Sequence, residues 1–348
     1  MNVSFFQPVL TSYRLPLFNA IAELPNVSFT LYSSVSRSDH GLSLDDSVHR
    51  IFNWNIDKDN NMRRLNIACL KMSLKAVRES DVIVHFADFK FPSLFLCMFF
   101  CFFSKTKFFL HGQGGYKRSG LLHKIVYNLS LCFCDGYVCY SQFSKKNLEN
   151  VVVGSLHKKI SVADNFLYVE GREVKVKGKD VLYIGRLRDG CGIELLLQSA
   201  LIVGLKVRVI GGGDEIFIKK LIQTYENLVY YGAIFDESEQ FSVAEGCFVG
   251  AYGGDAGLSV VHYMAYGLPV VIHDDLYKHM GPEPSYIVER ENGLTFKRGD
   301  IVSLSQVLNE LKDDVELQHK LSSGAFYTFL KLQNPPMHEK FAKILGIS

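Results

Sequence analysis

The sequence lacks the cysteine spacings of a zinc ribbon or a disulfide scaffold, because its eight cysteines include no CxxC pair and follow no regular spacing. Several of them, such as Cys97, Cys101 and Cys139, stand in apolar runs. We interpret them as reduced core residues of a cytoplasmic protein. The sequence also lacks a GxxxxGKS/T phosphate loop and any basic run interleaved with aromatic residues. These absences argue against a P-loop enzyme and against a nucleic-acid partner.

Long apolar runs are missing as well. The most apolar stretch, residues 92–103, has 12 residues and ends at Ser104 and Lys105, so it is too short to span a bilayer. We predict a buried helix there, with a helix that dips into a membrane as the alternative. Residues 1–7 show no basic region followed by a long apolar one, so we expect no signal peptide and a cytoplasmic location.

The net charge of +2 hides two halves of opposite sign. Residues 1–167 contain 19 lysines and arginines against 12 aspartates and glutamates, a net charge of +7, and the remainder contains 19 against 24, a net charge of −5. This asymmetry favours an anionic partner or a membrane surface for the first half, although ordinary surface variation produces the same pattern. The length of 348 residues favours two domains of ordinary size.

Short apolar runs alternate with segments of helical spacing twice along the chain. In the first half, strands are predicted at residues 3–6, 27–32, 82–86, 108–110, 136–139 and 160–163. In the second half, they are predicted at 181–184, 207–210, 229–231, 247–249, 270–272 and 286–288. Residues 33–61 are predicted to be irregular, and 170–180 to be a linker. The pattern predicts an α/β protein with two doubly wound domains, 1–168 and 169–325, whose strand ends face each other across a cleft.

Residues 247–272, CFVGAYGGDAGLSVVHYMAYGLPVVI, read as a strand, a glycine-rich turn, a helix and a second strand. A helix that starts directly after such a turn presents unpaired N–H groups and a partial positive charge, which suit a phosphate group. The ligand would sit at residues 255–258. The alternative is a tight connection in which Asp255 only caps the helix.

Three further sites each allow a functional and a structural interpretation. Arg186 follows a predicted strand and can hold a diphosphate with two hydrogen bonds, or is an ordinary surface arginine. His111 also follows a strand, and is either a hydrogen-bond donor or proton carrier in the cleft or a structural histidine. Asp57 and Asp59 form a DxD sequence that is either a divalent-metal site or a solvated loop. The triple glycine at 211–213 indicates only close approach of the backbone.

Together these pieces resemble the GT-B fold glycosyltransferases, specifically the family 4 type that builds bacterial surface polysaccharides such as O-antigen, lipopolysaccharide or capsule. The resemblance covers nearly the whole chain and depends on the order of its motifs. These are YRLPLF at 13–18, HG at 111–112, VADN at 162–165, YIGRL at 183–187, VIGGG at 209–213 and GLSVVHYMAYGLPVV at 257–271.

The resemblance implies transfer of a sugar from a UDP- or GDP-linked donor with retention of configuration, without a metal or a cofactor. It implies catalytic roles for His111, Arg186 and Asp255. The donor-binding residues would be Gly185, Arg186, Arg188, Gly212, Asp255, Ala256, Gly257, Leu258 and His262. The acceptor side would include Tyr13, Arg14 and Lys90, with a lipid-linked glycan as acceptor and peripheral contact with the cytoplasmic face of the inner membrane. The last segment, 326–348, would cross back to the first domain, broken at Pro335-Pro336.

Two departures from the family pattern bear on activity. The family usually carries two glutamates eight positions apart, and here those positions hold Gly254 and His262. Asp255 is the one carboxylate left at the turn, and it is predicted to meet sugar hydroxyls. The family's lysine in GRLxxxKG is Cys191 here, and a thiol does not supply that charge. Two alternatives stay open. The DxD sequence allows a metal-dependent glycosyltransferase that uses Asp57 and Asp59, and the two departures suggest a catalytically weak subunit that binds nucleotide sugars.

Overall fold

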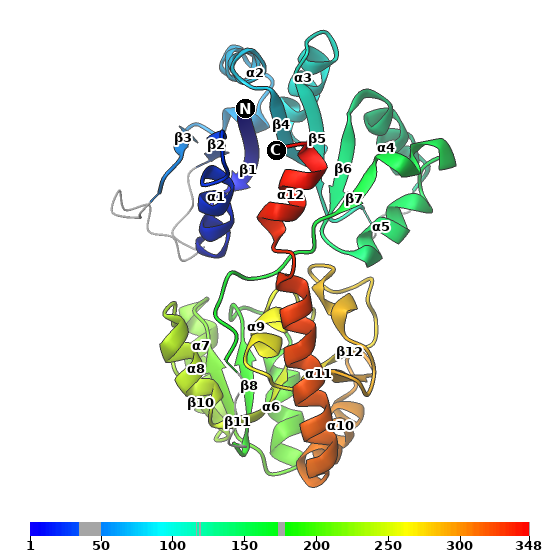
Figure 1. Cartoon of the computed structure of the whole chain (residues 1–348). Helices are drawn as coiled ribbons and strands as arrows, with labels where there is room; N and C mark the ends of the chain where they lie inside the picture. Colours follow the sequence, from blue (N-terminus) through cyan, green and yellow to red (C-terminus); the bar gives the residue numbers. More distant parts are fainter. Residues whose placement is uncertain (35–49, 116, 118–119, 173–177, 348) are drawn as a thin grey trace. The chain divides into compact units, whose positions relative to one another are not determined.

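The chain forms two compact units in the computed structural model, which describes residues 1–34, 50–115, 117, 120–172 and 178–347 (Figure 1). Unit 1 combines Met1–Tyr168 with Pro335–Ser348, and unit 2 is Val169–Asn334. The chain therefore runs from unit 1 into unit 2 and returns to unit 1.

The described part of unit 1 contains a parallel sheet with the strand order β3-β2-β1-β4-β5-β6-β7. Its strands are β1 (Asn2–Val9), β2 (Ser28–Ser34), β3 (Asn53–Asp57), β4 (Val82–Phe86), β5 (Lys107–Gly112), β6 (Gly136–Cys139) and β7 (Ile160–Val162). Its helices are α1 (Leu15–Ala22), α2 (Ile67–Glu79), α3 (Pro92–Phe102), α4 (Leu121–Phe133), α5 (Gln142–Glu149) and α12 (Met337–Leu345). The strand order reverses between β1 and β4, and ligand sites of such sheets form beyond the ends of these two strands.

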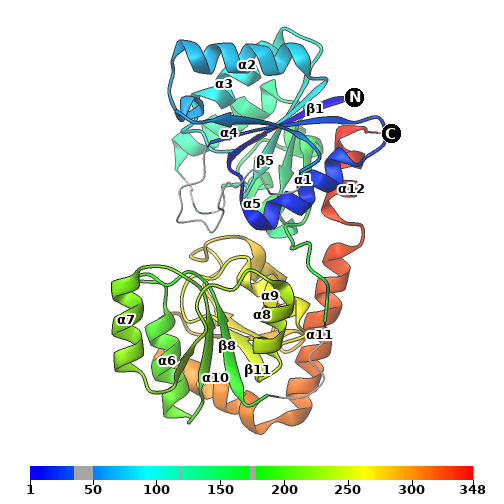
Figure 2. The same ribbon diagram turned by 90° about the vertical axis from the view of Figure 1, so that its left-hand side faces the viewer.

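Successive side chains of β1 point to opposite faces of the sheet, so two helical layers cover it. Phe5 packs edge to face against Phe18 of α1 at 5.8 Å and against Phe341 of α12 at 5.3 Å between ring centroids. Phe6 joins the core that α2, α3 and α4 supply, which includes Leu94. Figure 2 shows α1 and α12 on one side of the sheet and α2 and α3 on the other.

The C-terminal helix α12 is anchored to unit 1 by polar contacts as well as by Phe341. Lys340 Nζ forms an ion pair with Asp164 at 3.0 Å, just after β7. The boundary predicted after residue 325 falls inside α11 (Val315–Gln333), which belongs to unit 2. The return to unit 1 begins only at Pro335, because a proline cannot continue the hydrogen-bonding pattern of a helix.

Unit 2 contains a second parallel sheet in the residues described, with the order β10-β9-β8-β11-β12-β13. Its strands are β8 (Asp180–Ile184), β9 (Val207–Ile210), β10 (Leu228–Tyr230), β11 (Cys247–Ala251), β12 (Val270–His273) and β13 (Gly293–Phe296). Its helices are α6 (Ile193–Ile202), α7 (Glu215–Thr224), α8 (Glu237–Ala244), α9 (Ser259–Ala265), α10 (Ile301–Asp313) and α11. The strand order reverses between β8 and β11, so the loops after these strands are the expected place for a ligand.

Aspartates begin four helices of unit 2. The side chains of Asp214, Asp236, Asp300 and Asp314 accept hydrogen bonds from first-turn N–H groups of α7, α8, α10 and α11. Such caps satisfy the N–H groups that a helix start otherwise leaves open. Helix α9 differs, because its N-cap residue is Leu258 and no side chain caps it.

The fold confirms the predicted α/β class with two parallel Rossmann-like sheets, but three local predictions were wrong. The segment predicted to be irregular contains the strand β3. The strand predicted at 286–288 is absent; a 3₁₀ turn (Glu283–Tyr286) lies there, and the edge strand is β13. Residues 35–49 of the predicted irregular segment and 173–177 of the predicted linker lie outside the described residues.

The third error concerns the apolar run, which was predicted to be a buried helix. Helix α3 buries Leu94 and Cys97 on its inner face but exposes Phe99 and Phe102, with Phe103 directly after it, on its outer face. None of the described helices combines the length and the apolar character that crossing a membrane requires.

Candidate functional site

The loops after β8 and β9 are joined by backbone hydrogen bonds beyond the ends of the strands. Gly185 N–H donates to Ile210 O at 3.0 Å, and Leu187 N–H donates to Gly212 O at 2.9 Å. Leu187 is buried, whereas Arg186 between the two bonded residues is exposed. The backbone of Arg186 is therefore fixed at the strand end while its guanidinium reaches the surface.

The loop after β8 also touches the turn after β11. Gly192 has a φ of +82°, and a Cβ there would collide with the backbone of Gly254. Only glycine allows this approach, because it has no Cβ and adopts positive φ readily. Cys191 is buried, and its thiol carries no positive charge. Arg188 of the same loop is exposed.

Helix α9 is fixed against both central strands by Tyr263. Its hydroxyl accepts a hydrogen bond from Ile184 N–H at 3.0 Å and donates to Ala251 O at 3.4 Å. The start of α9 therefore lies next to the loop that carries Arg186.

The start of α9 presents three N–H groups with no acceptor among the described residues, those of Gly257, Leu258 and Ser259. Ala256 was predicted to bind the donor, but it is fully buried and its N–H donates to His279 Nδ1 at 3.0 Å. The donor contact predicted for its backbone is therefore not supported. The other three N–H groups form a short array that suits an anion.

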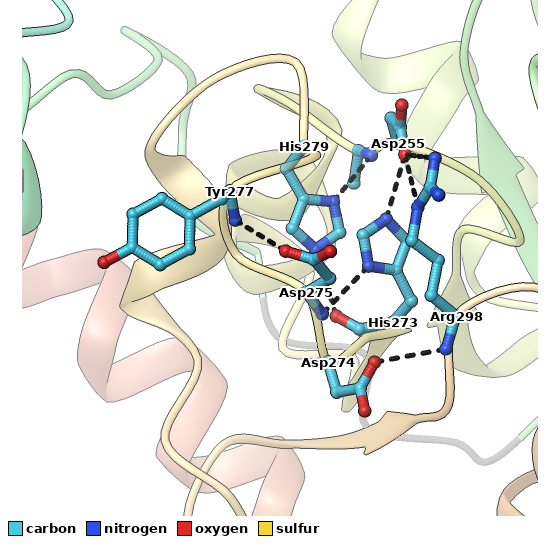
Figure 3. Close-up of polar contacts among 8 residues, drawn as sticks. Asp255, His273, Asp274, Asp275, Tyr277, His279 and Arg298 are labelled. Atoms are coloured by element: carbon cyan, nitrogen blue, oxygen red, sulfur yellow. Dashed lines mark hydrogen bonds and ion pairs between the residues drawn. The ribbon is translucent and has the colours of Figure 1, made fainter. Parts of the chain in front are cut away.

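Asp255 does not cap α9, which removes that alternative. Its Oδ1 accepts hydrogen bonds from His273 Nε2 at 3.1 Å and from Arg298 Nη2 and Nε at 3.1 and 3.3 Å (Figure 3). No donor in the described part of the chain reaches Oδ2, and the side chain is 38% exposed. Burial alone would raise the pKa of Asp255, but the hydrogen bonds from Arg298 and His273 outweigh it and lower that pKa. Asp255 is therefore an ionised carboxylate with one oxygen held and one oxygen open.

His262 is a neutral histidine in α9. Burial lowers its pKa to about 4, and its Nδ1 has no hydrogen-bond partner among the residues described. A neutral ring with an unpaired nitrogen can form one hydrogen bond to a ligand, so the predicted donor contact of His262 stays a prediction.

His111 lies in the interior of unit 1, in β5. It is 4% exposed, and its ring packs against Tyr140 and Phe341 with centroids at 4.6 and 5.0 Å. Burial, and then the charge of Arg14, lower its pKa well below the usual value, so it does not carry protons near neutral pH. This placement favours the structural alternative, and the predicted catalytic role of His111 stays a prediction.

The predicted acceptor residues follow the two central strands of unit 1. Tyr13 and Arg14 come after β1, and Lys90 lies in the loop between β4 and α3. Tyr13 and Lys90 are exposed. Arg14 is buried, with its guanidinium over the rings of Tyr13 and Tyr140 at 5.5 and 5.3 Å. The strand order therefore places Tyr13 and Lys90 at one switch point, while Arg14 supports the loop from inside.

Asp57 ends β3 and has a structural role. Its Oδ1 accepts from Asn61 Nδ2 at 2.9 Å and its Oδ2 from Met62 N–H at 2.7 Å. Within the described ranges, no group of three or more His, Cys, Asp or Glu residues is arranged to hold a metal. Asp57 is buried and binds its own loop through both oxygens, so it does not lie in a solvated loop, and no group of metal ligands among the described residues supports the metal-site interpretation.

Three residues of the site were missed from the sequence, His273, His279 and Arg298. His273 ends β12 and Arg298 follows β13, so both belong to the strand-end pattern that drew attention to Asp255. A correct prediction of β13 would have pointed to Arg298.

Comparison with known proteins identifies a family for most of unit 2. Residues 168–326 match the family described as Glycosyl transferases group 1, and this range covers nearly all of unit 2. No curated protein matches the chain in sequence.

Solved structures share the fold at low sequence identity. A glycosyltransferase from Rickettsia africae has a TM-score of 0.71 and 13% identity, over 100% of this chain and 99% of its own. HepE from Anabaena, in complex with UDP and glucose, has a TM-score of 0.69 and 14% identity, over 99% of both chains. TarM from S. aureus, in a complex that includes UDP, has a TM-score of 0.61 and 16% identity, over 79% of this chain. This chain covers only 58% of TarM, less than two thirds of its length.

The two parallel sheets and the strand-end site define an α/β protein with the GT-B fold. Within this fold, unit 2 contains the segment that matches the group 1 glycosyltransferases. The resemblance is therefore confirmed for the GT-B fold, and the match of this segment agrees with a group 1 glycosyltransferase.

Proposed function

We propose that the protein is a retaining glycosyltransferase that moves a sugar from a UDP-sugar to a glycan acceptor without a metal ion. One observation carries the proposal. Arg186, the open N–H groups of residues 257–259 and the open oxygen of Asp255 all follow the adjacent strands β8 and β11. UDP is preferred to GDP as the donor nucleotide because the HepE and TarM complexes contain UDP.

The roles in this proposal follow from charge. Arg186 and the N–H groups bind the diphosphate, and Arg188 adds a second positive charge. The bond between the anomeric carbon and the diphosphate oxygen breaks, the acceptor oxygen bonds to that carbon on the same face, and the acceptor proton leaves with the diphosphate. Donors already aimed at the departing diphosphate stabilise the charge that develops in the transition state. Gly185 and Gly212 keep the neighbouring backbone close, and His262 offers one hydrogen bond to the donor.

The test is the thermal stability of the protein with UDP, GDP and UDP-sugars at millimolar concentration. A saturating ligand should stabilise the fold by a few kcal/mol. We expect UDP to raise the melting temperature of the wild type and of Lys219→Ala, which removes an exposed charge on α7, and to have little effect on Arg186→Ala. EDTA should not change the response. If no nucleotide stabilises the wild type, or if EDTA abolishes the response, the proposed function is wrong.

Hydrolysis separates an enzyme from a binding subunit. A glycosyltransferase without acceptor releases the sugar slowly to water, whereas a subunit that only binds leaves the UDP-sugar intact. We expect the UDP-sugar that stabilises the protein most to be hydrolysed, and Arg186→Ala to lose about 100-fold or more of that rate. Binding without any turnover would favour the binding subunit.

We further propose a lipid-linked glycan of a bacterial surface polysaccharide as acceptor, bound by unit 1 near Tyr13 and Lys90 at a membrane surface. The outer faces of α3 and α4 support this. Phe103 is 72% exposed and Leu122 is 75% exposed. These faces also expose Phe95, Phe99, Phe102, Leu121, Ile125, Leu129 and Phe133.

Charge supports the same surface. Phe102 of α3 and Phe133 of α4 are in contact, with ring centroids at 5.4 Å, so the two exposed apolar faces adjoin. Between Asp88 and Asp135 the sequence has six lysines and arginines and no aspartate or glutamate. An exposed apolar surface on a segment with six basic residues and no acidic ones suits an anionic bilayer.

Sedimentation with vesicles tests this surface. We expect wild type to bind vesicles that contain phosphatidylglycerol, and to bind neutral phosphatidylcholine vesicles much more weakly. The double variant Phe103→Ser with Leu122→Ser should lose this binding, while Ile216→Ser, which removes an apolar residue that is 83% exposed on unit 2, should keep it. Equal binding by all three proteins would contradict the assignment of this surface.

A further inference from the structure

Two side chains of unit 2, His273 and Arg298, form hydrogen bonds to the same oxygen of Asp255, and a third, His279, stacks on His273. His273 comes from the end of β12, Arg298 from the residues after β13, and His279 from the loop after β12 (Figure 3). The rings of His273 and His279 stack at 3.7 Å between centroids with an angle of 8° between their planes. His273 and His279 are both fully buried.

Backbone N–H groups fix the tautomer of each imidazole. Asp275 N–H donates to His273 Nδ1 at 3.2 Å, so the proton of His273 is on Nε2 and is donated to Asp255. Ala256 N–H donates to His279 Nδ1, so His279 donates from Nε2 to the carbonyl of His273 at 3.0 Å. Both rings are neutral, and burial lowers the pKa of each, to about 4 for His279. The stack is therefore a rigid support with one defined donor toward Asp255.

The distribution of hydrogen bonds on Asp255 differs from that of a structural carboxylate. Asp57 uses both of its oxygens to bind its own loop. Asp255 takes all three donors on Oδ1 and keeps Oδ2 clear of donors from the described residues. Arg298 also places a positive charge against Asp255, which reduces the repulsion between this carboxylate and a diphosphate bound nearby.

We propose that His273, His279 and Arg298 are positioning residues that hold Asp255 so that its Oδ2 accepts hydrogen bonds from hydroxyl groups of the donor sugar. This inference rests on the proposed function, because it assigns the sugar part of the same donor site. An ionised carboxylate only accepts hydrogen bonds, so Asp255 selects for a sugar with hydroxyl groups at the positions that face it.

Calorimetry separates the sugar contact from the nucleotide contact. The affinity of the wild type is measured for UDP and for UDP-glucose, UDP-galactose and UDP-N-acetylglucosamine, and the tightest UDP-sugar is kept as the probe. The quantity of interest is the ratio of the dissociation constant of UDP to that of the UDP-sugar. Loss of a hydrogen bond to a charged group reduces binding about tenfold or more, so this ratio is measurable.

Arg298→Ala is the informative variant, because Arg298 is 47% exposed and the fold does not depend on its burial. We expect it to bind UDP within about twofold of the wild type and to lower the ratio about tenfold. Asp255→Asn should lower the ratio similarly, and Arg298→Lys should restore part of it. Arg290→Ala removes a comparably exposed ion pair, to Glu310, away from Asp255 and should leave both affinities unchanged.

The outcomes are distinct. Equal losses for UDP and the UDP-sugar in Arg298→Ala, or an unchanged ratio in Asp255→Asn, would overturn the inference and leave the nucleotide site in place. A wild type that binds UDP as tightly as every UDP-sugar would also overturn it. A wild type that binds no nucleotide would remove the proposed function and this inference with it.

Discussion

His111 illustrates at the scale of one residue how burial limits what a histidine can do. The residue follows an apolar strand and precedes a glycine-rich loop, a pattern that predicts a side chain in the ligand site. In the structure, the ring is enclosed by Tyr140 and Phe341, and Phe341 comes from a helix more than 200 residues further along the chain. The sequence around His111 therefore carries no sign of the residue that covers it.

The variant His111→Phe distinguishes a structural role of His111 from a catalytic one. Because the ring is neutral and packed against aromatic residues, we expect His111→Phe to fold with a change in unfolding free energy within about 2 kcal/mol. Hydrolysis of the UDP-sugar should stay within a few-fold of the wild type. Urea denaturation measures the unfolding free energy, and an assay of UDP-sugar hydrolysis measures the rate. A loss of about 100-fold in rate at unchanged stability would instead show that His111 contacts the donor.

Asp255 and Arg298 mark what a single sequence reveals about the site and what it does not. Asp255 is visible because it stands in the glycine-rich turn between a strand and a helix. Arg298 forms an ion pair with Asp255, yet it is 43 residues away in sequence and follows a strand that was not predicted. The sequence therefore points to Asp255, whereas its partner Arg298 can be identified only from the tertiary structure.

At the scale of elements, the site depends on loops that pack backbone against backbone. Gly192 packs against Gly254, and the loop after β8 bonds to the loop after β9, so the loop that carries Arg186 is held against the turn that precedes α9. Such approaches require glycine at the contact, which explains why several recognisable motifs of this chain contain glycine turns.

Two glycines with the same backbone conformation test this packing. Gly192 and Gly204 both have positive φ, at +82° and +68°, but a Cβ at Gly204 would meet no atom within 4 Å. We expect Gly204→Ala to cost about 1–2 kcal/mol of unfolding free energy, from backbone strain alone. Gly192→Ala should cost at least about 2 kcal/mol more and abolish UDP binding. Urea denaturation and UDP calorimetry on both variants give the answer. Equal costs with UDP binding retained would contradict the close packing of these loops.

The predicted elements were most accurate in the centres of the sheets and least accurate at the edges. Buried strands such as β4 and β11 have apolar runs that identify them. The strands that were missed or misplaced, β3 and β13, are both edge strands. An edge strand pairs on one side only and tolerates polar residues, as in NWNID of β3, so its sequence resembles a loop.

At the scale of the whole molecule, the two units have separate cores and different surface charge. The basic unit 1 presents the apolar faces of α3 and α4, and unit 2 contains the proposed donor site. The family match covers residues 168–326, and all of the residues predicted to bind the donor lie in this range.

Buried neutral histidines make the stability of the molecule depend on pH. Burial lowers the pKa of His85 and His279 to about 4, whereas a histidine in the unfolded chain titrates near 6.5. Between these values the unfolded chain binds more protons than the folded chain, so stability falls as the pH is lowered. We expect the unfolding free energy to be nearly constant from pH 8 to about pH 7 and to fall by several kcal/mol by about pH 4.5. Urea denaturation from pH 8 to pH 4.5 measures this pH dependence. Constant stability down to pH 4.5 would show that these histidines do not stay neutral in the folded protein.

A crystal structure of the protein with UDP tests the central claim most directly. The account predicts that the diphosphate oxygens lie about 3 Å from the guanidinium of Arg186 and from the N–H groups of residues 257–259. Diphosphate density elsewhere on the molecule, with Arg186 and the start of α9 in contact with solvent only, would contradict it.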